Sequence, residues 1–268
     1  MPPDAPAPSP HPAAPAEGPP LLSVDGPRAT ITLNRPTHLN RLHRDDLLAL
    51  RRCFEQVAAD RSLRALVLTA RGRVFCAGYH LGDLDSGSAT GDPRLFEHTV
   101  DALERLPLPT VCALNGSVYG GATDLALACD FRVGVEGMEL RMPAARLGLH
   151  YYPGGLHRYV SRLGLGAAKR LFLLAQAAGA DELLAIGYLD RLAAPEALDA
   201  AVDDLVRALA AGAPLAVSGM KRSLDEIARG EPDLQAMRER EERCAASADL
   251  REGLAAWRDK RSPRFGGG

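Results

Sequence analysis

The chain has 268 residues, of which 46% are hydrophobic and 25% are charged. That length suffices for one large domain or two small ones, with a core that needs no disulfide or metal. The 32 basic and 34 acidic residues give a formal net charge of -2. This balance excludes a broad basic surface for nucleic acid or anionic membranes, although it leaves room for a local basic patch. No apolar run approaches the ~20 residues of a membrane span.

The cysteines and the start of the chain indicate a cytoplasmic protein. The cysteines are odd in number and form no CxxC pair: Cys53, Cys76, Cys112, Cys129 and Cys244. We therefore expect reduced, mostly buried thiols rather than a disulfide framework or a zinc site. Residues 1–20 are rich in proline and have neither the basic start nor the apolar run of a signal peptide. We expect them to form a disordered, partly polyproline tail.

Strand-like and helix-like patterns alternate through the middle of the chain. The apolar spacing predicts strands over 29–34, 65–69, 110–114 and 131–135, and helices over 45–59, 93–106 and 122–128. A glycine-rich loop is expected over 71–91. Strands that alternate with helices in this order favour an α/β core with parallel strands.

The last third of the chain changes character and becomes helical. We expect helices over 167–178, 195–211, 214–229 and 233–260. The chain accordingly divides into a core over 21–205 and a helical C-terminal region over 206–268. The second part is expected to pack on the core or on a neighbouring subunit.

Two loops carry the chemistry. One spans Val74–Leu81 at the end of a strand, and the other spans Asn115–Leu125 where a strand runs into a helix. Small residues let a ligand approach the backbone closely, and N–H groups at a helix start favour anions or developing oxyanions. Two such N–H groups from separate loops can hold one carbonyl oxygen. Either loop alone is explained equally well as an ordinary tight connection.

Together with further motifs, these loops resemble the crotonase superfamily, that is, the enoyl-CoA hydratase/isomerase family. The motifs occur in the family's order over almost the whole chain after the tail: Asn34–Pro36 with Asn40, Phe75–Leu81, Asn115–Asp130, Met142–Gly155 and Arg251–Phe265. The resemblance implies a crotonase-type ββα spiral core with a helical C-terminal region. It also implies an enzyme that acts on an acyl-CoA thioester.

The resemblance implies an oxyanion hole made by two backbone groups. The N–H of Tyr79 and the N–H of Gly121 occupy the family's two donor positions. They are expected to hold the thioester oxygen as it becomes an enolate, and each such donor typically lowers the barrier by ~3 kcal/mol. The hole indicates the class of reaction, because hydration, isomerisation, decarboxylation and carbon–carbon cleavage can all pass through an enolate.

Asp124 stands where the family places its first catalytic glutamate, so the resemblance implies an acid/base role for it. An aspartate that only stabilises the start of a helix is the simpler alternative. The family's second glutamate is missing, because Pro143 is followed by Ala144. Hydration by the usual two carboxylates is therefore in doubt.

A second resemblance favours decarboxylation. Leu147–Tyr151 and Gly116–Ala122 are similar to segments of the methylmalonyl-CoA decarboxylase branch, in which a tyrosine at the position of Tyr151 lines the site. That branch has a histidine at the position of Tyr79, which this chain lacks unless His80 replaces it. Tyr151 is explained equally well as part of the pocket wall.

Other residues are assigned to the acyl pocket or to coenzyme A. We expect Glu97 and His98 to face solvent, although some relatives place a base on this helix. The resemblance implies that coenzyme A, as part of the substrate, contacts the residues Ala77, Arg41, Trp257 and Lys260. Leucine precedes Asn40 where the family has a basic residue, so Arg41 would compensate. The last two would reach the ligand of a neighbouring subunit in a homotrimer or dimer of trimers. No tightly bound cofactor and no metal are expected.

The sequence thus favours hydration or isomerisation of a 2-enoyl-CoA. The alternative is decarboxylation of a malonyl-type acyl-CoA. A catalytically silent CoA-binding or scaffold protein is the further alternative, although a scaffold has no need of the Gly-Gly approach at residues 120–121.

Overall fold

The structure is a computed structural model that describes residues 16–80 and 92–268. Its larger sheet runs in the order β1-β2-β3-β5-β7-β10, and every neighbouring pair is parallel except the β1–β2 hairpin. The strands are β1 (Leu21–Asp25), β2 (Arg28–Leu33), β3 (Ala65–Ala70), β5 (Thr110–Leu114), β7 (Phe131–Val135) and β10 (Arg191–Ala193). The predicted α/β core with parallel strands is confirmed.

A smaller sheet positions the two loops singled out above. It runs in the order β4-β6-β8-β9, with β4, β6 and β8 parallel and β9 antiparallel to β8. Its strands are β4 (Val74–Cys76), β6 (Ser117–Tyr119), β8 (Glu139–Arg141) and β9 (Ala178–Gly179). β4 follows β3 along the chain, and β6 follows β5. At both places the polypeptide therefore passes from the larger sheet into the smaller one.

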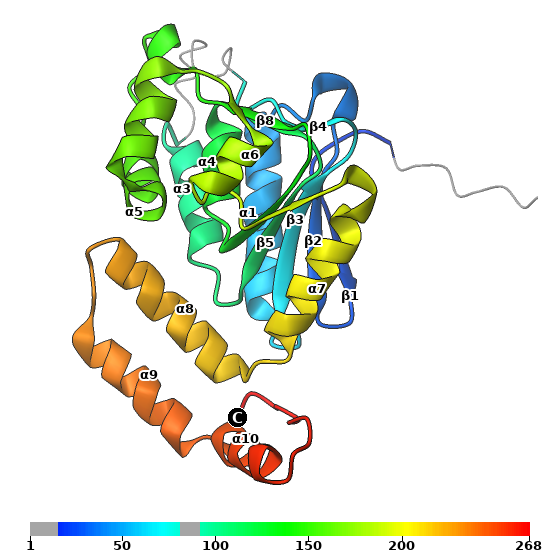
Figure 1. Ribbon diagram of the computed structural model, residues 1–268, viewed down its shortest axis with the longest axis vertical. Helices are drawn as coiled ribbons and strands as arrows, with labels where there is room; N and C mark the ends of the chain where they lie inside the picture. The colour runs from blue at the N-terminus through cyan, green and yellow to red at the C-terminus, as the bar shows by residue number, and fades with distance from the viewer. Residues whose placement is uncertain (1–15, 81–91) are drawn as a thin grey trace, which may run out of the picture.

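Helices cover both faces of the larger sheet. α7 packs against β3, β5 and β7, and α1 lies on the other side (Figure 1). β5 is buried along its whole length, as is usual for parallel strands that are covered on both faces. The helices are α1 (Arg44–Ala59), α3 (Leu95–Glu104), α4 (Gly121–Leu127), α5 (Pro153–Lys169), α6 (Ala180–Ala185), α7 (Leu198–Ala210), α8 (Pro214–Ala228), α9 (Leu234–Ala246) and α10 (Ala248–Arg258).

α1 shows how the sequence pattern sets a helix. Leu47, Leu50, Phe54 and Val57 recur at helical spacing and are all buried. Asp46 helps to cap the N-terminus of α1, because its carboxylate accepts a hydrogen bond from the backbone N–H of His43 at 2.9 Å in a capping box. The helix predicted over 45–59 is therefore confirmed to within one residue.

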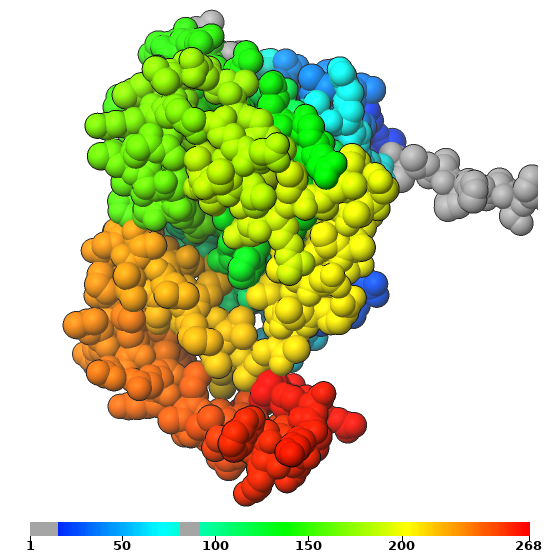
Figure 2. Space-filling model, viewed as in Figure 1, coloured from blue at the N-terminus to red at the C-terminus, as the bar shows by residue number. Residues whose placement is uncertain are grey.

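α8, α9 and α10 extend beyond the rest of the molecule (Figure 2). Lys221 ties α8 to the core, because its Nζ lies 2.6 Å from Asp130 Oδ1 and donates to the backbone oxygen of Glu104 at 3.1 Å. The predicted boundary between residues 205 and 206 falls inside α7. The division into two parts stays a prediction.

Four sequence-based expectations differ from the structure or lie partly outside the described residues. A helix was expected over 167–178, but α5 begins at Pro153 and Ala178 belongs to β9. A single helix was expected over 233–260, but Ser247 has an extended backbone there and its Oγ accepts from the N–H of Leu250, which starts α10. Most of the tail predicted over 1–20, and the end of the loop over 71–91, lie outside the described residues. Within the described part of the chain, no helix is long and apolar enough to cross a membrane.

Candidate active site

The pairing of β4 with β6 brings the two glycine-containing loops together. Both strands are parallel, so their carboxyl ends meet at one edge of the smaller sheet. A Cβ placed on Gly78 would lie 2.8 Å from the backbone oxygen of Tyr119 and 3.4 Å from the nitrogen of Gly121, and Gly78 has a φ of +94°. Only glycine fits this close approach.

A cavity of about 340 Å³ opens where the loops meet. Its volume lies within the range of small-molecule sites. The backbone of residues 77–79 and 119–121 forms one side of it, and mostly apolar side chains form the rest. Among these, the ring of Phe96 packs directly over Gly121, because a Cβ on that glycine would lie 2.7 Å from its Cζ. A side chain larger than that of glycine at position 121 would therefore collide with Phe96.

Tyr79 and Gly121, the two expected donors, both line this cavity. Leu42 donates to the oxygen of Gly78 and accepts from the N–H of His80, each at 2.9 Å. Since successive N–H groups of an extended chain alternate in direction, the N–H of Tyr79 points to the opposite side from Leu42. Gly121 is the first residue of α4, so its N–H has no acceptor within that helix.

Asp124 is held in a buried ion pair. Its side chain is 0% exposed, and Arg158 Nη1 donates to both carboxylate oxygens, at 2.9 Å to Oδ1 and 2.8 Å to Oδ2. The hydroxyl of Tyr152 also donates to Oδ2. Burial raises the pKa of Asp124, while Arg158 and the Tyr152 hydroxyl act in the opposite direction. Among the described residues, Tyr152 lines the cavity and Asp124 does not.

Arg158 is shared among three carboxylates. It bonds to Glu104 Oε1 through Nε and to Asp101 Oδ1 through Nη2, each at 2.9 Å, in addition to Asp124. Although burial opposes its charge, Asp124 and Glu104 raise the pKa of Arg158, so it stays a cation. Burial likewise opposes the charge of Glu104, but Arg158 and Arg162 hold the pKa of Glu104 below its ordinary value. The guanidinium is thus the centre of a buried charged network.

Two tyrosines form the cavity wall in front of Asp124. The rings of Tyr151 and Tyr152 stack with centroids 4.5 Å apart. Burial, reinforced by the charge of Asp124, raises the pKa of both phenols well above 10, so both are neutral at neutral pH. The Tyr151 hydroxyl is buried and makes no hydrogen bond within the described chain, although it lies close to that of Tyr152.

Of the two α3 residues expected to face solvent, Glu97 and His98, one lies at the cavity instead. Glu97 lines the cavity, whereas it was expected to face solvent; the reason is that α3 lies along the cavity with Phe96 and Glu97 toward it. His98 turns away, and its Nδ1 lies 2.6 Å from Asp92 Oδ2. Ala144, at the position of the family's second glutamate, also lines the cavity.

Of the residues assigned to coenzyme A, only Ala77 lies at the cavity. Arg41 is near the first loop, and its Nε is buried without an acceptor among the described residues. Trp257 and Lys260 lie at the far end of the molecule, on α10 and just after it. A single chain therefore does not bring them to the cavity.

Sequence reasoning missed Arg158 and Phe96. Arg158 is 34 positions from Asp124 and looks like an ordinary charged residue of an amphipathic helix. Phe96 sits at helical spacing in α3 like any core residue. No local motif marks either residue, because each acquires its role only through tertiary packing.

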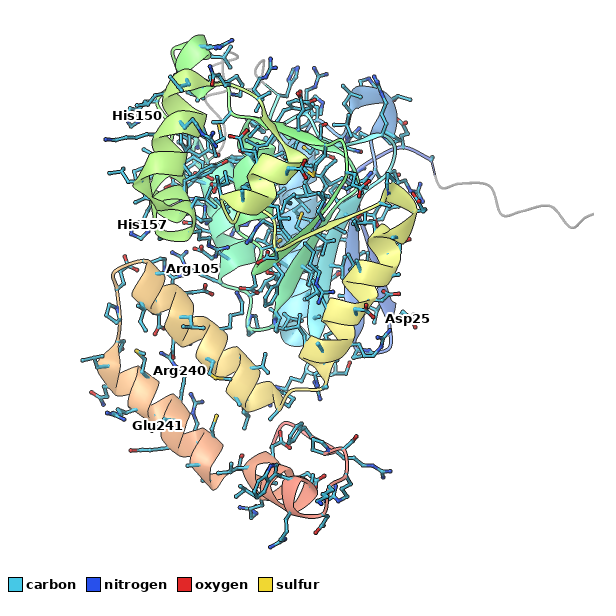
Figure 3. The ribbon with its side chains drawn as sticks, viewed as in Figure 1. Asp25, Arg105, His150, His157, Arg240 and Glu241 are labelled. Atoms are coloured by element: carbon cyan, nitrogen blue, oxygen red, sulfur yellow. The ribbon has the colours of Figure 1, made fainter. Side chains whose placement is uncertain are left out.

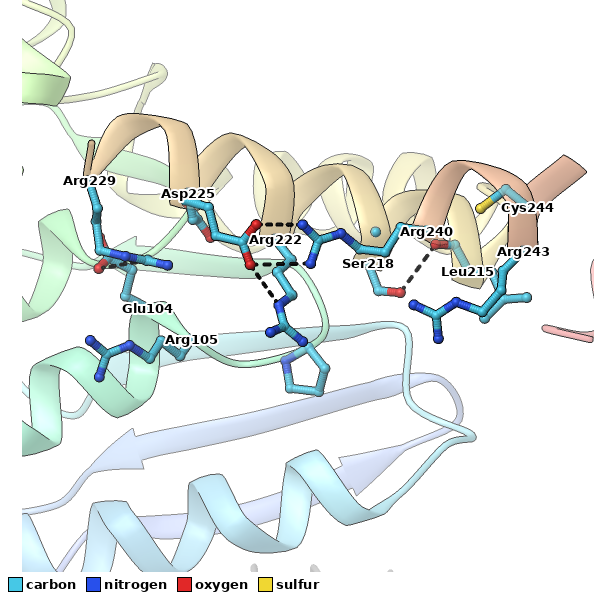
Figure 4. Close-up of a pocket in the computed structure, with 13 residues that line it drawn as sticks. Glu104, Arg105, Leu215, Ser218, Arg222, Asp225, Arg229, Arg240, Arg243 and Cys244 are labelled. Atoms are coloured by element: carbon cyan, nitrogen blue, oxygen red, sulfur yellow. Dashed lines mark hydrogen bonds and ion pairs between the residues drawn. The ribbon is translucent and has the colours of Figure 1, made fainter. Parts of the chain in front are cut away.

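A second cavity, of about 520 Å³, lies between the core and helices α8 and α9 (Figure 4). Arg222 and Arg240 both donate to Glu226 there, and Arg229 lies 3.5 Å from Glu104. Arg105 stands on the core side and Arg240 on the side of α9 (Figure 3). Its charged groups therefore hold the C-terminal helices to the core, and neither glycine-containing loop reaches it.

Comparisons with known proteins show which family the chain is similar to. The sequence model of the enoyl-CoA hydratase/isomerase family matches residues 28–268. The chain belongs to this family. The 1,2-epoxyphenylacetyl-CoA isomerase of Escherichia coli is 32% identical to it, over 92% of this chain and 98% of the relative. The crotonyl-CoA hydratase of Syntrophomonas wolfei is 29% identical, over 91% and 96% of the two chains.

Solved structures of the family share the fold. An enoyl-CoA hydratase/carnithine racemase from Magnetospirillum magneticum superimposes with a TM-score of 0.87 at 28% identity, covering 94% of this chain and 97% of the other. The expected crotonase-type fold is confirmed, and so is the expectation of an enzyme of the hydratase/isomerase family.

Proposed function

We propose that the protein hydrates or isomerises a 2-enoyl-CoA or its double-bond isomer, with the thioester oxygen bound by the N–H groups of Tyr79 and Gly121. The observation that carries the proposal is the convergence of two strand-end loops on one apolar cavity, next to a buried carboxylate, Asp124. Two fixed donors stabilise negative charge that develops on the oxygen in the transition state. Asp124 supplies the acid/base function.

Isomerisation suits the site better than hydration does. Asp124 is a single acid/base group, and Ala144 offers none on the wall where the family has a second glutamate. Moving a double bond needs one group that takes a proton from one carbon and returns it to another. Hydration needs, in addition, a group that activates water, and Glu97, unlike Asp124, is a carboxylate that lines the described cavity.

Decarboxylation of a malonyl-type acyl-CoA is the second candidate. The buried hydroxyl of Tyr151 supports it, because this group has no hydrogen-bond partner among the described residues and a phenol in an apolar pocket can donate to a substrate carboxylate. The breaking carbon–carbon bond supplies the electron pair of the enolate, which the same two N–H groups would hold. This reaction needs no base to take a proton from carbon.

We also propose a homotrimer or a dimer of trimers in the cytoplasm. The support for assembly is the apolar surface that α8 and α10 expose in one chain, including Met220, Leu224 and Leu254, each at least 60% exposed. Through such contacts Trp257 and Lys260 would reach coenzyme A bound to a neighbour, beside Ala77 and Arg41 of that subunit. The free thiols fit a reducing compartment.

The proposal is tested with purified protein and three thioesters: crotonyl-CoA, 3-hexenoyl-CoA and methylmalonyl-CoA. Mass spectrometry detects gain of water or loss of carbon dioxide, and proton NMR detects a shift of the double bond. Turnover of either enoyl-CoA supports the proposal. Loss of carbon dioxide alone moves the function to decarboxylation. Tight binding of CoA without turnover of any of the three indicates the catalytically silent alternative.

A further inference from the structure

We propose that Tyr152 is the catalytic residue that exchanges protons with the substrate, that Asp124 behind it takes up and returns the proton of the phenol, and that Arg158 is a positioning residue. This inference rests on the proposed function, because it specifies how the proton moves in an enolate-forming reaction. It differs from a direct role for Asp124 in one respect: the carboxylate never touches the thioester.

Tyr152 lies between the cavity and the carboxylate of Asp124. Asp124 is fully buried, and both of its carboxylate oxygens are already occupied by Arg158 Nη1. Its remaining partner, the Tyr152 hydroxyl, belongs to the residue that lines the cavity. A substrate carbon in the cavity therefore meets the phenol before it can meet the carboxylate.

The direction of the hydrogen bond between Tyr152 and Asp124 favours the same role for the phenol. The pKa of Tyr152 is well above 10, so the phenol keeps its single hydrogen at neutral pH, and that hydrogen is donated to Asp124. The phenol oxygen still has a lone pair that can accept a further proton. Tyr152 is thus set to receive a proton at its oxygen while it passes its own proton on.

Proton removal from the substrate then consists of two linked transfers. The Cα–H bond of the thioester breaks, and its proton forms a new O–H bond on Tyr152. The former hydroxyl proton of Tyr152 moves to Asp124 Oδ2. The electron pair of the C–H bond enters the enolate, whose charge rests on the oxygen held by Tyr79 and Gly121. The reverse transfer returns a proton to Cα or Cγ, and the phenol and the carboxylate end as they began.

The charge on Asp124 must change during this cycle. Arg158 also binds Glu104 and Asp101, each at 2.9 Å. When Asp124 takes up a proton, these two carboxylates still compensate the guanidinium. The buried arginine therefore keeps its place in both states, and the carboxylate can alternate between charged and neutral without leaving an unpaired cation.

A purely steric role for Tyr152 is the competing explanation, and Tyr152→Phe separates the two because it keeps the ring. Tyr159→Phe is the matched control. Tyr159 is a fully buried phenol whose hydroxyl donates to Thr123 Oγ1 at 2.5 Å, and it does not line the described cavity. Both variants lose one hydroxyl near Asp124, but only the first loses it from a residue that lines the described cavity.

The experiment follows crotonyl-CoA and 3-hexenoyl-CoA in D₂O by proton NMR, which records turnover and uptake of deuterium at carbon. Ligand affinity is measured by calorimetry. We expect Tyr152→Phe to lower both rates by about 100-fold or more, the usual scale of acid–base catalysis, with affinity within about threefold of wild type. Tyr159→Phe should keep rates near wild type. Equal rates for Tyr152→Phe and wild type would overturn the inference while leaving the proposed function intact.

A double variant tests the serial arrangement. Tyr152→Phe combined with Asp124→Asn should be no slower than the slower single variant, because both changes interrupt one relay. Losses that multiply would show two independent groups and overturn the inference. Failure of wild type to turn over any thioester is a different result, which removes the proposed function and this inference with it.

Discussion

Arg158 contacts both carboxylate oxygens of Asp124 through one nitrogen, Nη1, at 2.9 and 2.8 Å. The pair lies where water does not reach, since Asp124 is 0% exposed and Arg158 is 3% exposed. Burial alone would favour the neutral acid, and the guanidinium opposes this. The protonation state of the candidate base therefore depends on a residue that no sequence motif marks.

The first prediction concerns the pH dependence of activity. Asp124 must be ionised to accept a proton, so activity falls as pH drops through its pKa. Because Arg158 lowers that pKa, Arg158→Met should move the acid limb of log(kcat/KM) to higher pH, and Arg158→Lys should leave it nearer to wild type. Stopped-flow rates across pH check this. An acid limb at unchanged or lower pH in Arg158→Met would contradict it.

The same substitution should also cost stability. Arg158→Met leaves Asp124, Glu104 and Asp101 without their shared cation, and breaking a buried ion pair in this way typically costs ~3–5 kcal/mol. Urea unfolding gives the change in the free energy of unfolding. The pH profiles are therefore recorded well below the melting temperature of the variant.

The second prediction concerns the stability of the same network at acid pH. Although burial opposes its charge, Glu104 has a pKa below its ordinary value of 4.5 in the folded protein. Its stabilising contribution is therefore complete above pH 4.5 and is lost as pH falls through the lower, folded value. The difference in the free energy of unfolding between wild type and Glu104→Gln should be largest near pH 7 and shrink below pH 4.5. A difference that stays constant from pH 7 to the acid end would contradict this.

The third prediction concerns the close approach of the two loops. Gly78→Ala places a Cβ 2.8 Å from the backbone oxygen of Tyr119 at a φ of +94°, so the loop carrying Tyr79 must move. We expect kcat/KM to fall by about 100-fold or more, the scale of losing one oxyanion donor. Gly137→Ala is the control, since Gly137 has a similar φ of +77° but open space around it. It should cost ~1–2 kcal/mol of stability and leave kcat/KM unchanged.

Much of the core was predictable because its signals are local. The helical periodicity of α1 and the apolar runs of β3, β5 and β7 each lie within a short stretch of sequence, so these elements can be predicted locally. The loop residues Tyr79 and Gly121 were predictable as a pair because each sits inside a contiguous motif. Both residues line one cavity in the structure, and their role as oxyanion donors stays a prediction.

The remaining features depend on contacts that a linear pattern does not contain. The break between α9 and α10 comes from one residue, Ser247, whose side chain caps the second helix within a run of otherwise helical residues. The Tyr152–Asp124–Arg158 chain joins α4, the start of α5 and its second turn, and no spacing rule links those positions. Trp257 was assigned to coenzyme A, yet within one chain it stands apart from the cavity.

The last prediction concerns Trp257, the only tryptophan of the chain, which is 84% exposed. If α10 covers coenzyme A bound to a neighbouring subunit, binding places the indole against the adenine and removes it from water. Addition of CoA should then quench the fluorescence and shift its emission to shorter wavelength. Butyryl-pantetheine, which lacks the nucleotide, should fill the acyl cavity without this change. Lys260→Ala should weaken the CoA titration. Unchanged emission at a CoA concentration that calorimetry shows to be saturating would place α10 away from the nucleotide.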